Sequence, residues 1–382
     1  MKSNIFSAEK KRIEFGELRI GEVALKNLKE VCESNWASYG PKCKEFEKKW
    51  GELFDYKYNL ATSSGTDAVI QACLSLYSLG ADRQSEVIAP ALSFIATANA
   101  IRSADLKPVF CDVNRETLNI DPSKIEEKIT DKTKAIIAVH TMGRPCEMDA
   151  IMDISKKYNL LIIEDACESH GAKYKERYIG SIGHISCFSF YVAHLICCGE
   201  GGMVSTRRKD LYNSVFSTRC HGRSGFYFDH PVYGLNSKMN DLEASVGLEA
   251  IDVFWETFNK RHKYMKTMRK ACEGFEDLAF FSEEDEGNTN CPHGFSVTLK
   301  DPNKLELFTN HLDQQEIHWK RNFGSVPTQH GAFSYLGYQM GDFPEAEHIG
   351  DNGFHIGVHQ HLSDDDVQYV CENLIEGFKK VS

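Results

Sequence analysis

Short apolar runs alternate with longer helix-like stretches between residues 57 and 206. The apolar runs are typical of buried strands, and they read YNLAT, EVIAPA, KPVFCDV, KAIIAVH, LLIIEDA, ISCFSF and GMVST. Between several of them the pattern predicts helices, at residues 67–78, 93–102, 122–129 and 148–157. This alternation predicts a mostly parallel α/β sheet with helices on both faces, in which ligands bind at the carboxyl ends of the strands.

The pattern changes near residue 248. A long polar helix is predicted first, and a strand and two further helices follow, at residues 252–273, 294–299, 304–315 and 364–379. The acidic, Asn-rich segment 282–292 is predicted to be an exposed loop. We therefore divide the chain into a large α/β domain and a smaller C-terminal domain, at 1–250 and 251–382.

Composition narrows the classes of function. The chain has 382 residues, 42% of them hydrophobic, and a formal net charge of −11, which is typical of a soluble globular protein and unsuited to nonspecific nucleic-acid binding. No apolar run reaches the roughly 20 residues of a membrane span, and the first residues lack the apolar stretch of a secretion signal. The 13 scattered cysteines include no C-x-x-C pair, so we expect reduced thiols in a cytoplasmic protein and no metal site.

Two segments place polar residues where predicted strands end. Residues 63–67, SSGTD, lie between a strand and a helix, where free backbone N–H groups suit a phosphate and where Ser and Thr are also common helix caps. The strand LLIIED delivers Asp165 at its carboxyl end. A carboxylate there can keep a pyridine nitrogen protonated, which makes the ring an electron sink, or it can cap the next turn.

A third segment joins SCFSFYVAH to the glycine-rich run GEGGMVST. The doubled glycine indicates a turn with positive φ or a close backbone approach. A lone histidine is usually a structural residue, so the interest of His194 comes from its position and not from its residue type.

Together these segments are similar to the sugar aminotransferase family named after DegT, DnrJ, EryC and StrS. The similarity extends over most of the chain, through TSSGTDA, VIAPALSFIATANAI, FCDVNRETLNIDPSKIE, VHTMGRPCEMDAI, EDACESHGA, SFYVAH with GEGGMVST, and YGLNSKMNDLEASVGLEAI. The resemblance implies an α/β large domain of aspartate-aminotransferase type, the type I fold of pyridoxal phosphate (PLP) enzymes. It also implies a smaller C-terminal α+β domain.

The resemblance also implies how the cofactor is held. It assigns the cofactor phosphate to Gly65, Thr66 and Ser189. Phe94 is expected to stack on the ring, and Asp165 to pair with the pyridine nitrogen. Asn236, in the YGLNSKM segment, is expected to reach the phosphate in the partner subunit, which implies a homodimer.

Two residues depart from the family pattern. His194 stands where ordinary members have the lysine that forms the Schiff base, and Glu168 stands where they usually have a glutamine facing the ring oxygen. The pair resembles the lysine-lacking sugar 3-dehydratase branch, of the GDP-4-keto-6-deoxymannose 3-dehydratase type, and the C-terminal GVHQHLS segment is similar to the same branch. A related branch acts on CDP-sugars with an iron–sulfur cluster that needs a C-x-C pair, and this sequence has no such pair.

The branch resemblance implies a reaction and a set of ligands. The cofactor would rest as pyridoxamine 5'-phosphate (PMP), the substrate would be a nucleotide-linked 4-keto-6-deoxyhexose of deoxysugar and O-antigen biosynthesis, and glutamate would regenerate the amine. His194 is expected to act as base and then acid in removing the C3 hydroxyl. Glu168 either bonds the ring oxygen or positions His194. Lys238, Lys320 and Arg321 either pair with a diphosphate or are simply solvated.

The sequence leaves two other functions open. One is a nucleotide-sugar aminotransferase that uses histidine as its base. The other is a non-catalytic relative that binds cofactor or nucleotide sugar, since loss of the lysine is also what decay would produce. The retention of Asp165, Phe94 and Ser189, with Glu168 accompanying His194, favours an active dehydratase.

Overall fold

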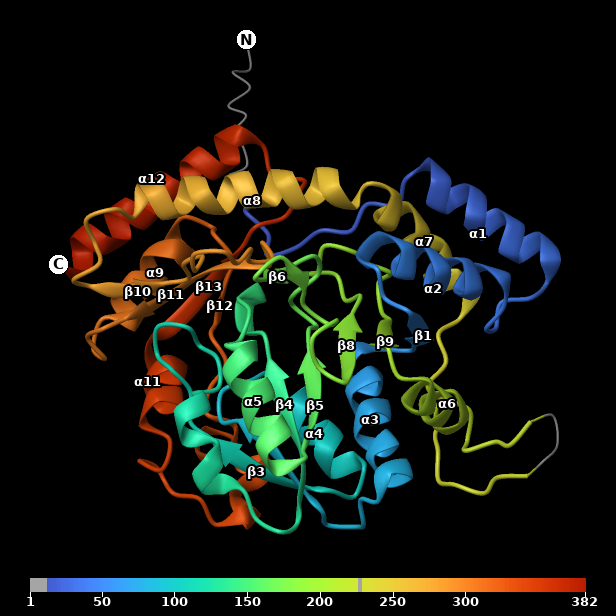
Figure 1. Cartoon of the computed structure of the whole chain (residues 1–382). Coiled ribbons are helices and arrows are strands. Elements are labelled where there is room, and N and C mark those ends of the chain that lie inside the picture. Colours follow the sequence, from blue (N-terminus) through green and yellow to red (C-terminus); the bar gives the residue numbers. More distant parts are fainter. Residues whose placement is uncertain (1–11, 226–228) are drawn as a thin grey trace.

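Seven strands form the central sheet of the protein, which the structure, a computed structural model, describes over residues 12–225 and 229–382 (Figure 1). Across the sheet the order is β1 (Tyr58–Thr62), β9 (Gly202–Thr206), β8 (Ile185–Ser189), β5 (Leu161–Asp165), β4 (Thr133–Val139), β2 (Glu86–Pro90) and β3 (Lys107–Cys111). Strand β9 is antiparallel to β1 and β8, and the other neighbours are parallel. The apolar runs of the sequence are these strands, so the predicted α/β class is confirmed.

Helices cover both faces of this sheet, because successive strand residues point to opposite sides. Ile162 belongs to the apolar core on one face, and its neighbour Ile163 belongs to the core on the other. The first core is completed by α2 (Pro41–Phe54), α5 (Met148–Tyr158) and α7 (Asp241–Asp252). The second is completed by α3 (Gly65–Ser75), α4 (Ala96–Ser103) and α6 (Lys209–Thr218).

A second, antiparallel sheet with its own apolar core is built from the C-terminal part of the chain. Its strands, in spatial order, are β10 (Ala279–Phe281), β11 (Gly294–Leu299), β13 (Gly353–Gly357) and β12 (Trp319–Arg321). Its core is completed by α8 (Phe254–Ala271), α9 (Leu305–Gln314) and α12 (Asp364–Val381) (Figure 1). Ile13 also joins this part through a bridge to Ile317. The domain boundary near residue 250 stays a prediction.

The remaining elements pack at the edges of these two cores. Glu249 accepts hydrogen bonds from the N–H groups of Gly21 and Ala24 and so caps the first turn of α1 (Glu22–Ser34). A small hairpin and two short helices complete the fold, as β6 (Lys173–Tyr174), β7 (Arg177–Tyr178), α10 (Val326–Gln329) and α11 (Pro344–Asn352). Within the described residues, no helix has the length and apolar character to cross a membrane.

Two predicted helices differ from the structure. Residues 122–129 form two 3-10 turns, Pro122–Lys124 and Glu126–Lys128, in place of an α-helix. Only Ile125 of this segment is fully buried, which is too little apolar contact to stabilise a longer helix. The helix predicted over 252–273 begins at Phe254 instead, because the backbone at Val253 separates α7 from α8. The segment 282–292 contains no helix or strand, as predicted, but only residues 283–287 are exposed. The prediction of an exposed loop is wrong for residues 290–292, which are buried.

Candidate active site

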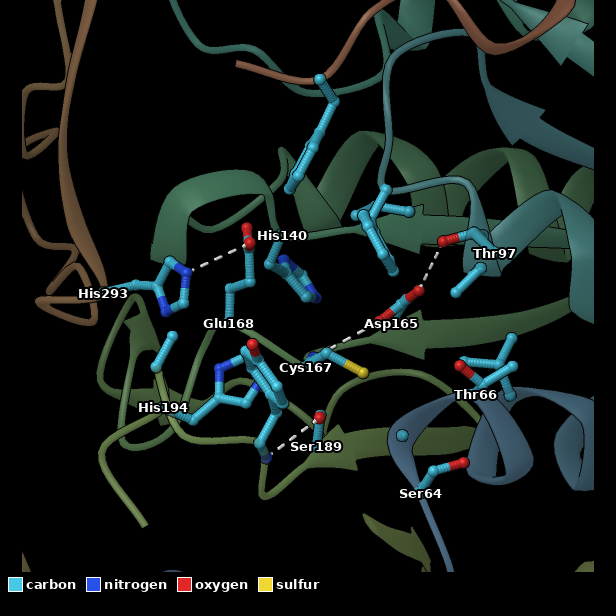
Figure 2. Close-up of a pocket in the computed structure, with 18 of the residues that line it drawn as sticks. Ser64, Thr66, Thr97, His140, Asp165, Cys167, Glu168, Ser189, His194 and His293 are labelled. Atoms are coloured by element: carbon cyan, nitrogen blue, oxygen red, sulfur yellow. Dashed lines mark hydrogen bonds and ion pairs between the residues drawn. The ribbon is translucent and has the colours of Figure 1, made fainter. Parts of the chain in front are cut away.

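A cavity of about 420 Å³ lies at the carboxyl ends of the parallel strands, between the two sheets (Figure 2). The predicted site residues that line it are Gly65, Thr66, Phe94, Asp165, Glu168, Ser189 and His194. The second sheet and its loops add His293, Lys320, Arg321, Phe323 and His355. The strand ends of the large sheet therefore bring the predicted residues together, and the C-terminal part closes the cavity.

One end of the cavity is a helix N-terminus. Ser64 caps α3 by accepting a hydrogen bond of 3.0 Å from the Asp67 N–H. The N–H groups that precede Asp67 in the first turn have no carbonyl partner within the helix and can bind a ligand. A Cβ atom on Gly65 would lie 2.5 Å from Cβ of Ser189. Glycine at this position therefore lets the Ser189 side chain approach the helix end. Hydroxyl groups and free N–H groups at a helix N-terminus form a site that suits a phosphate dianion.

Asp165 is a buried carboxylate at the end of β5. Its Oδ2 atom accepts a hydrogen bond of 2.8 Å from the Thr97 hydroxyl, and its Oδ1 atom accepts one of 3.4 Å from the Cys167 N–H. Burial raises the pKa of Asp165, and these hydrogen bonds counteract that effect. Both donors are neutral, so a protonated ring nitrogen would fit the carboxylate as a charge partner. Phe94, whose side chain is 60% exposed, offers an aromatic face to the same cavity.

His194 projects into the cavity from the turn that follows β8 (Figure 2). Its side chain is buried, and its Nδ1 atom has no hydrogen-bond partner among the described residues. Burial, together with the nearby charges of His293 and His170, lowers the pKa of His194 well below its ordinary value. The imidazole is therefore neutral near pH 7, which is the form a general base requires.

Arg261 of α8 fixes the backbone of this turn. Its guanidinium donates to the carbonyl oxygens of Ala193 and His194 at 3.1 and 3.3 Å, and to Oε1 of Gln360 at 2.6 Å. Because Arg261 is itself buried, these bonds hold the turn of His194 against the C-terminal part of the chain. Gln360 lies in the GVHQHLS segment, which is one of the segments similar to the dehydratase branch.

Buried His293 and partly buried Glu168 form a pair next to His194 (Figure 2). The Oε1 atom of Glu168 lies 3.3 Å from Nε2 of His293, and its Oε2 atom accepts a hydrogen bond of 2.7 Å from the Met142 N–H. Burial acts to raise the pKa of Glu168, but the charge and hydrogen bond of His293, with the Met142 N–H, hold it below its ordinary value. The ring of His293 thus contacts Glu168 and also lies beside the ring of His194.

His293 is a site residue that the sequence did not reveal. It lies in the CPHGF segment just before β11, where no motif of the large sheet identifies it. Of the three cationic residues considered for a diphosphate, Lys320 and Arg321 line the cavity, whereas Lys238 does not and donates to Asn236. Asn236 also lies outside the cavity of its own chain.

A mostly parallel sheet with a helix N-terminus and a buried carboxylate at its strand ends fits the class of PLP-dependent aminotransferases. The chain belongs to the DegT/DnrJ/EryC1/StrS aminotransferase family, which matches residues 19–375. The resemblance, the aspartate-aminotransferase-like fold and the PLP or PMP cofactor are thereby confirmed.

The alignments with individual relatives cover most of the chain. It is 32% identical to the GDP-perosamine synthase of Escherichia coli O157:H7, over 91% of this chain and 94% of that protein. It is 28% identical to the dTDP-4-dehydro-2,6-dideoxy-D-glucose 3-dehydratase of Saccharopolyspora spinosa, over 90% of this chain and 81% of that one. The PMP form of Spr1654 from Streptococcus pneumoniae has the same fold, with a TM-score of 0.89, 23% identity and coverage of 97% and 98%.

Proposed function

We propose that this protein is a PMP-dependent nucleotide-sugar 3-dehydratase. It removes the C3 oxygen of a nucleotide-linked 4-keto-6-deoxyhexose, and glutamate restores the amine form of the cofactor. The observation that carries the proposal is His194, a buried neutral imidazole in the cavity with no hydrogen-bond partner for Nδ1 among the described residues. The resemblance to the family assigns the Schiff-base lysine to this position. A relative named as a 3-dehydratase supports the same function.

The cavity residues fit a cofactor that is held without a covalent bond. In this proposal Gly65, Thr66 and Ser189 bind its phosphate. Asp165 pairs with its ring nitrogen, and Phe94 stacks on its ring. When bound, the group supplies an amine for the C4 ketone and a ring that withdraws electrons.

His194 carries the protons in this proposal. An imidazole cannot form a Schiff base, so the amine of the cofactor stays free for the sugar ketone. Neutral His194 would take up the proton next to that amine, and the electron-withdrawing ring would supply the electron pair with which the C3–O bond breaks. Over a full cycle the sugar exchanges its C3 hydroxyl for hydrogen, glutamate becomes 2-oxoglutarate, and the glutamate nitrogen leaves as ammonia.

A product analysis tests the proposed function. The protein is incubated with PMP, glutamate and 4-keto-6-deoxyhexoses linked to GDP, CDP or dTDP, and the sugars are read by mass. We expect a sugar that has lost one oxygen, with one ammonia and one 2-oxoglutarate for each molecule formed. An amino sugar without free ammonia would assign the protein to the aminotransferases. Cofactor binding without turnover of any of these sugars would indicate a non-catalytic relative.

We also propose that the active unit is a homodimer in which Asn236 completes the site of the partner subunit. Asn236 is exposed and lies outside its own cavity. Tyr233 and Val232 of the same segment are 68% and 50% exposed, which is the kind of apolar surface that a second copy would cover.

Subunit exchange tests this arrangement. Asn236→Asp places a negative charge next to the phosphate, and His194→Asn removes the base, so each variant alone should be inactive. In a mixed dimer one site receives His194 from one chain and Asn236 from the other, and activity should return after the two variants are mixed. If Asn236 served its own chain, both sites of the mixed dimer would stay defective and no activity would return.

A further inference from the structure

Two imidazoles stand side by side in the wall of the cavity. The ring centroids of His194 and His293 are 5.1 Å apart, and their planes are inclined by 33°. Both side chains are buried, and neither Nδ1 atom has a hydrogen-bond partner among the described residues. These two neighbouring imidazoles could therefore supply the one base and the one acid that the reaction proposed above needs.

The surroundings of the two rings differ. Other imidazoles and the cations Arg261 and Lys320 lie near His194, and their charges add to burial in keeping it unprotonated. His293 instead faces the carboxylate of Glu168, which the Met142 N–H holds in place from the other side. An ionised carboxylate only accepts hydrogen bonds, so the Nε2 atom of His293 carries a hydrogen in this contact. That leaves Nδ1 as the atom that can give or take a proton. The two rings thus differ in their neighbours: a carboxylate contacts His293, whereas imidazoles and cations surround His194.

The position of the pair also separates it from the groups that would hold the cofactor. In Figure 2, Ser64, Thr66 and Asp165 lie toward one side of the cavity, whereas His194, Glu168 and His293 lie toward the other. Lys320 and His355, from the second sheet, line the same cavity. A sugar bound beside His194 would therefore meet His293 on the side away from Ser64 and Thr66.

We propose that His293, paired with Glu168, is the general acid that protonates the departing C3 hydroxyl, while His194 acts as the base. This inference rests on the proposed 3-dehydratase function. The C3–O bond breaks with its electron pair on oxygen, and the proton from His293 makes the leaving group water. His194 has meanwhile gained one proton. Its transfer to His293, whose ring lies beside it, restores both residues for the next cycle.

The test separates two half-reactions. Both the removal of the C3 hydroxyl and the regeneration by glutamate need His194, but only the first has a hydroxyl to protonate. His293→Gln keeps an N–H donor for Glu168 and cannot transfer a proton. We expect this variant to lose about two to four orders of magnitude in dehydration rate, the usual contribution of a general acid. The formation of 2-oxoglutarate from glutamate should stay within a few-fold of wild type.

Controls make the result specific. His262 forms a comparable pair with Glu284 outside the cavity, with Nε2 and Oε1 2.8 Å apart, so His262→Gln should leave both half-reactions unchanged. Glu168→Gln should slow dehydration and spare the glutamate half-reaction. In the cofactor-free protein, a downfield imidazole N–H resonance should be present in wild type, vanish in His293→Gln and shift in Glu168→Gln.

Defined outcomes would overturn the inference. Equal loss of both half-reactions in His293→Gln would mean that His293 only positions its neighbours, and an unchanged dehydration rate would remove it from the reaction. A wild-type protein that makes an amino sugar would instead refute the 3-dehydratase function itself. If His293→Gln does not fold, the same split between half-reactions is measured in Glu168→Gln.

Discussion

Replacing His194 with asparagine should lower the rate of C3 dehydration by about two to four orders of magnitude. Asparagine keeps a polar side chain of similar size but cannot accept the proton that the imidazole removes. The contacts that would hold the cofactor, at Ser189, Asp165 and Phe94, are unchanged, so cofactor affinity should stay close to that of wild type. Product formation and retention of PMP after dialysis measure the two effects separately. An unchanged dehydration rate would show that His194 is not the base.

His194→Lys tests the same position in the opposite sense. In the proposed function residue 194 takes the place of the family's Schiff-base lysine, so in this variant borohydride should fix a pyridoxyl group on residue 194 and the product should shift toward an amino sugar. The wild-type protein should carry no such label. Lys320 is the residue to examine in this control. It lines the cavity, and burial lowers its pKa, which favours the neutral amine that could form a Schiff base. A label on Lys320 in wild type would contradict noncovalent binding.

Replacing Asp165 with asparagine should weaken cofactor binding strongly. In the proposed site this carboxylate faces a protonated ring nitrogen, and asparagine leaves that cation buried without its partner. Losing one member of a buried charge pair costs about 2 to 5 kcal/mol, which is roughly a 30-fold to several-thousand-fold loss of affinity. Titration of the cofactor-free protein with PMP, followed by fluorescence, measures this loss directly.

Thr97→Val is the matched control for that experiment. It removes a neutral hydrogen bond to Asp165 and leaves the charge in place, so it should cost only about 1 kcal/mol of affinity. The two variants should therefore differ clearly in their dissociation constants. If both weakened PMP equally, the charge of Asp165 would not be what binds the ring nitrogen.

Much of the large sheet follows from local sequence. Residues of the run LLIIED alternate between the two faces of the sheet, and both faces are buried, so the whole run is apolar until it reaches the carboxylates. Because parallel strands end at one edge, the strand pattern alone predicts that Asp165 and Ser189 share one site. The family resemblance added His194, which no local pattern distinguishes from a structural histidine.

Helix boundaries were less predictable where local pattern and packing disagree. The segment 122–129 has a helical composition, yet its surroundings bury only Ile125 fully, and 3-10 turns result. The sequence has no proline or glycine at Val253 that would predict the break between the two helices. Phe254 and Phe258, which follow the break, still belong to the core of the large sheet, and Tyr264 is the first residue of α8 in the core of the second sheet.

The sequence by itself determined the α/β sheet, the order of its motifs and the residues at its strand ends, because these depend on periodicity and on the direction of each strand. Only the tertiary structure decided which side chains from the other sheet enter the site. His293 meets Glu168, and Arg261 with Gln360 holds the turn of His194, because the second sheet packs over the strand ends. Such contacts depend on how the two sheets pack against each other, and no pattern along the chain encodes that arrangement.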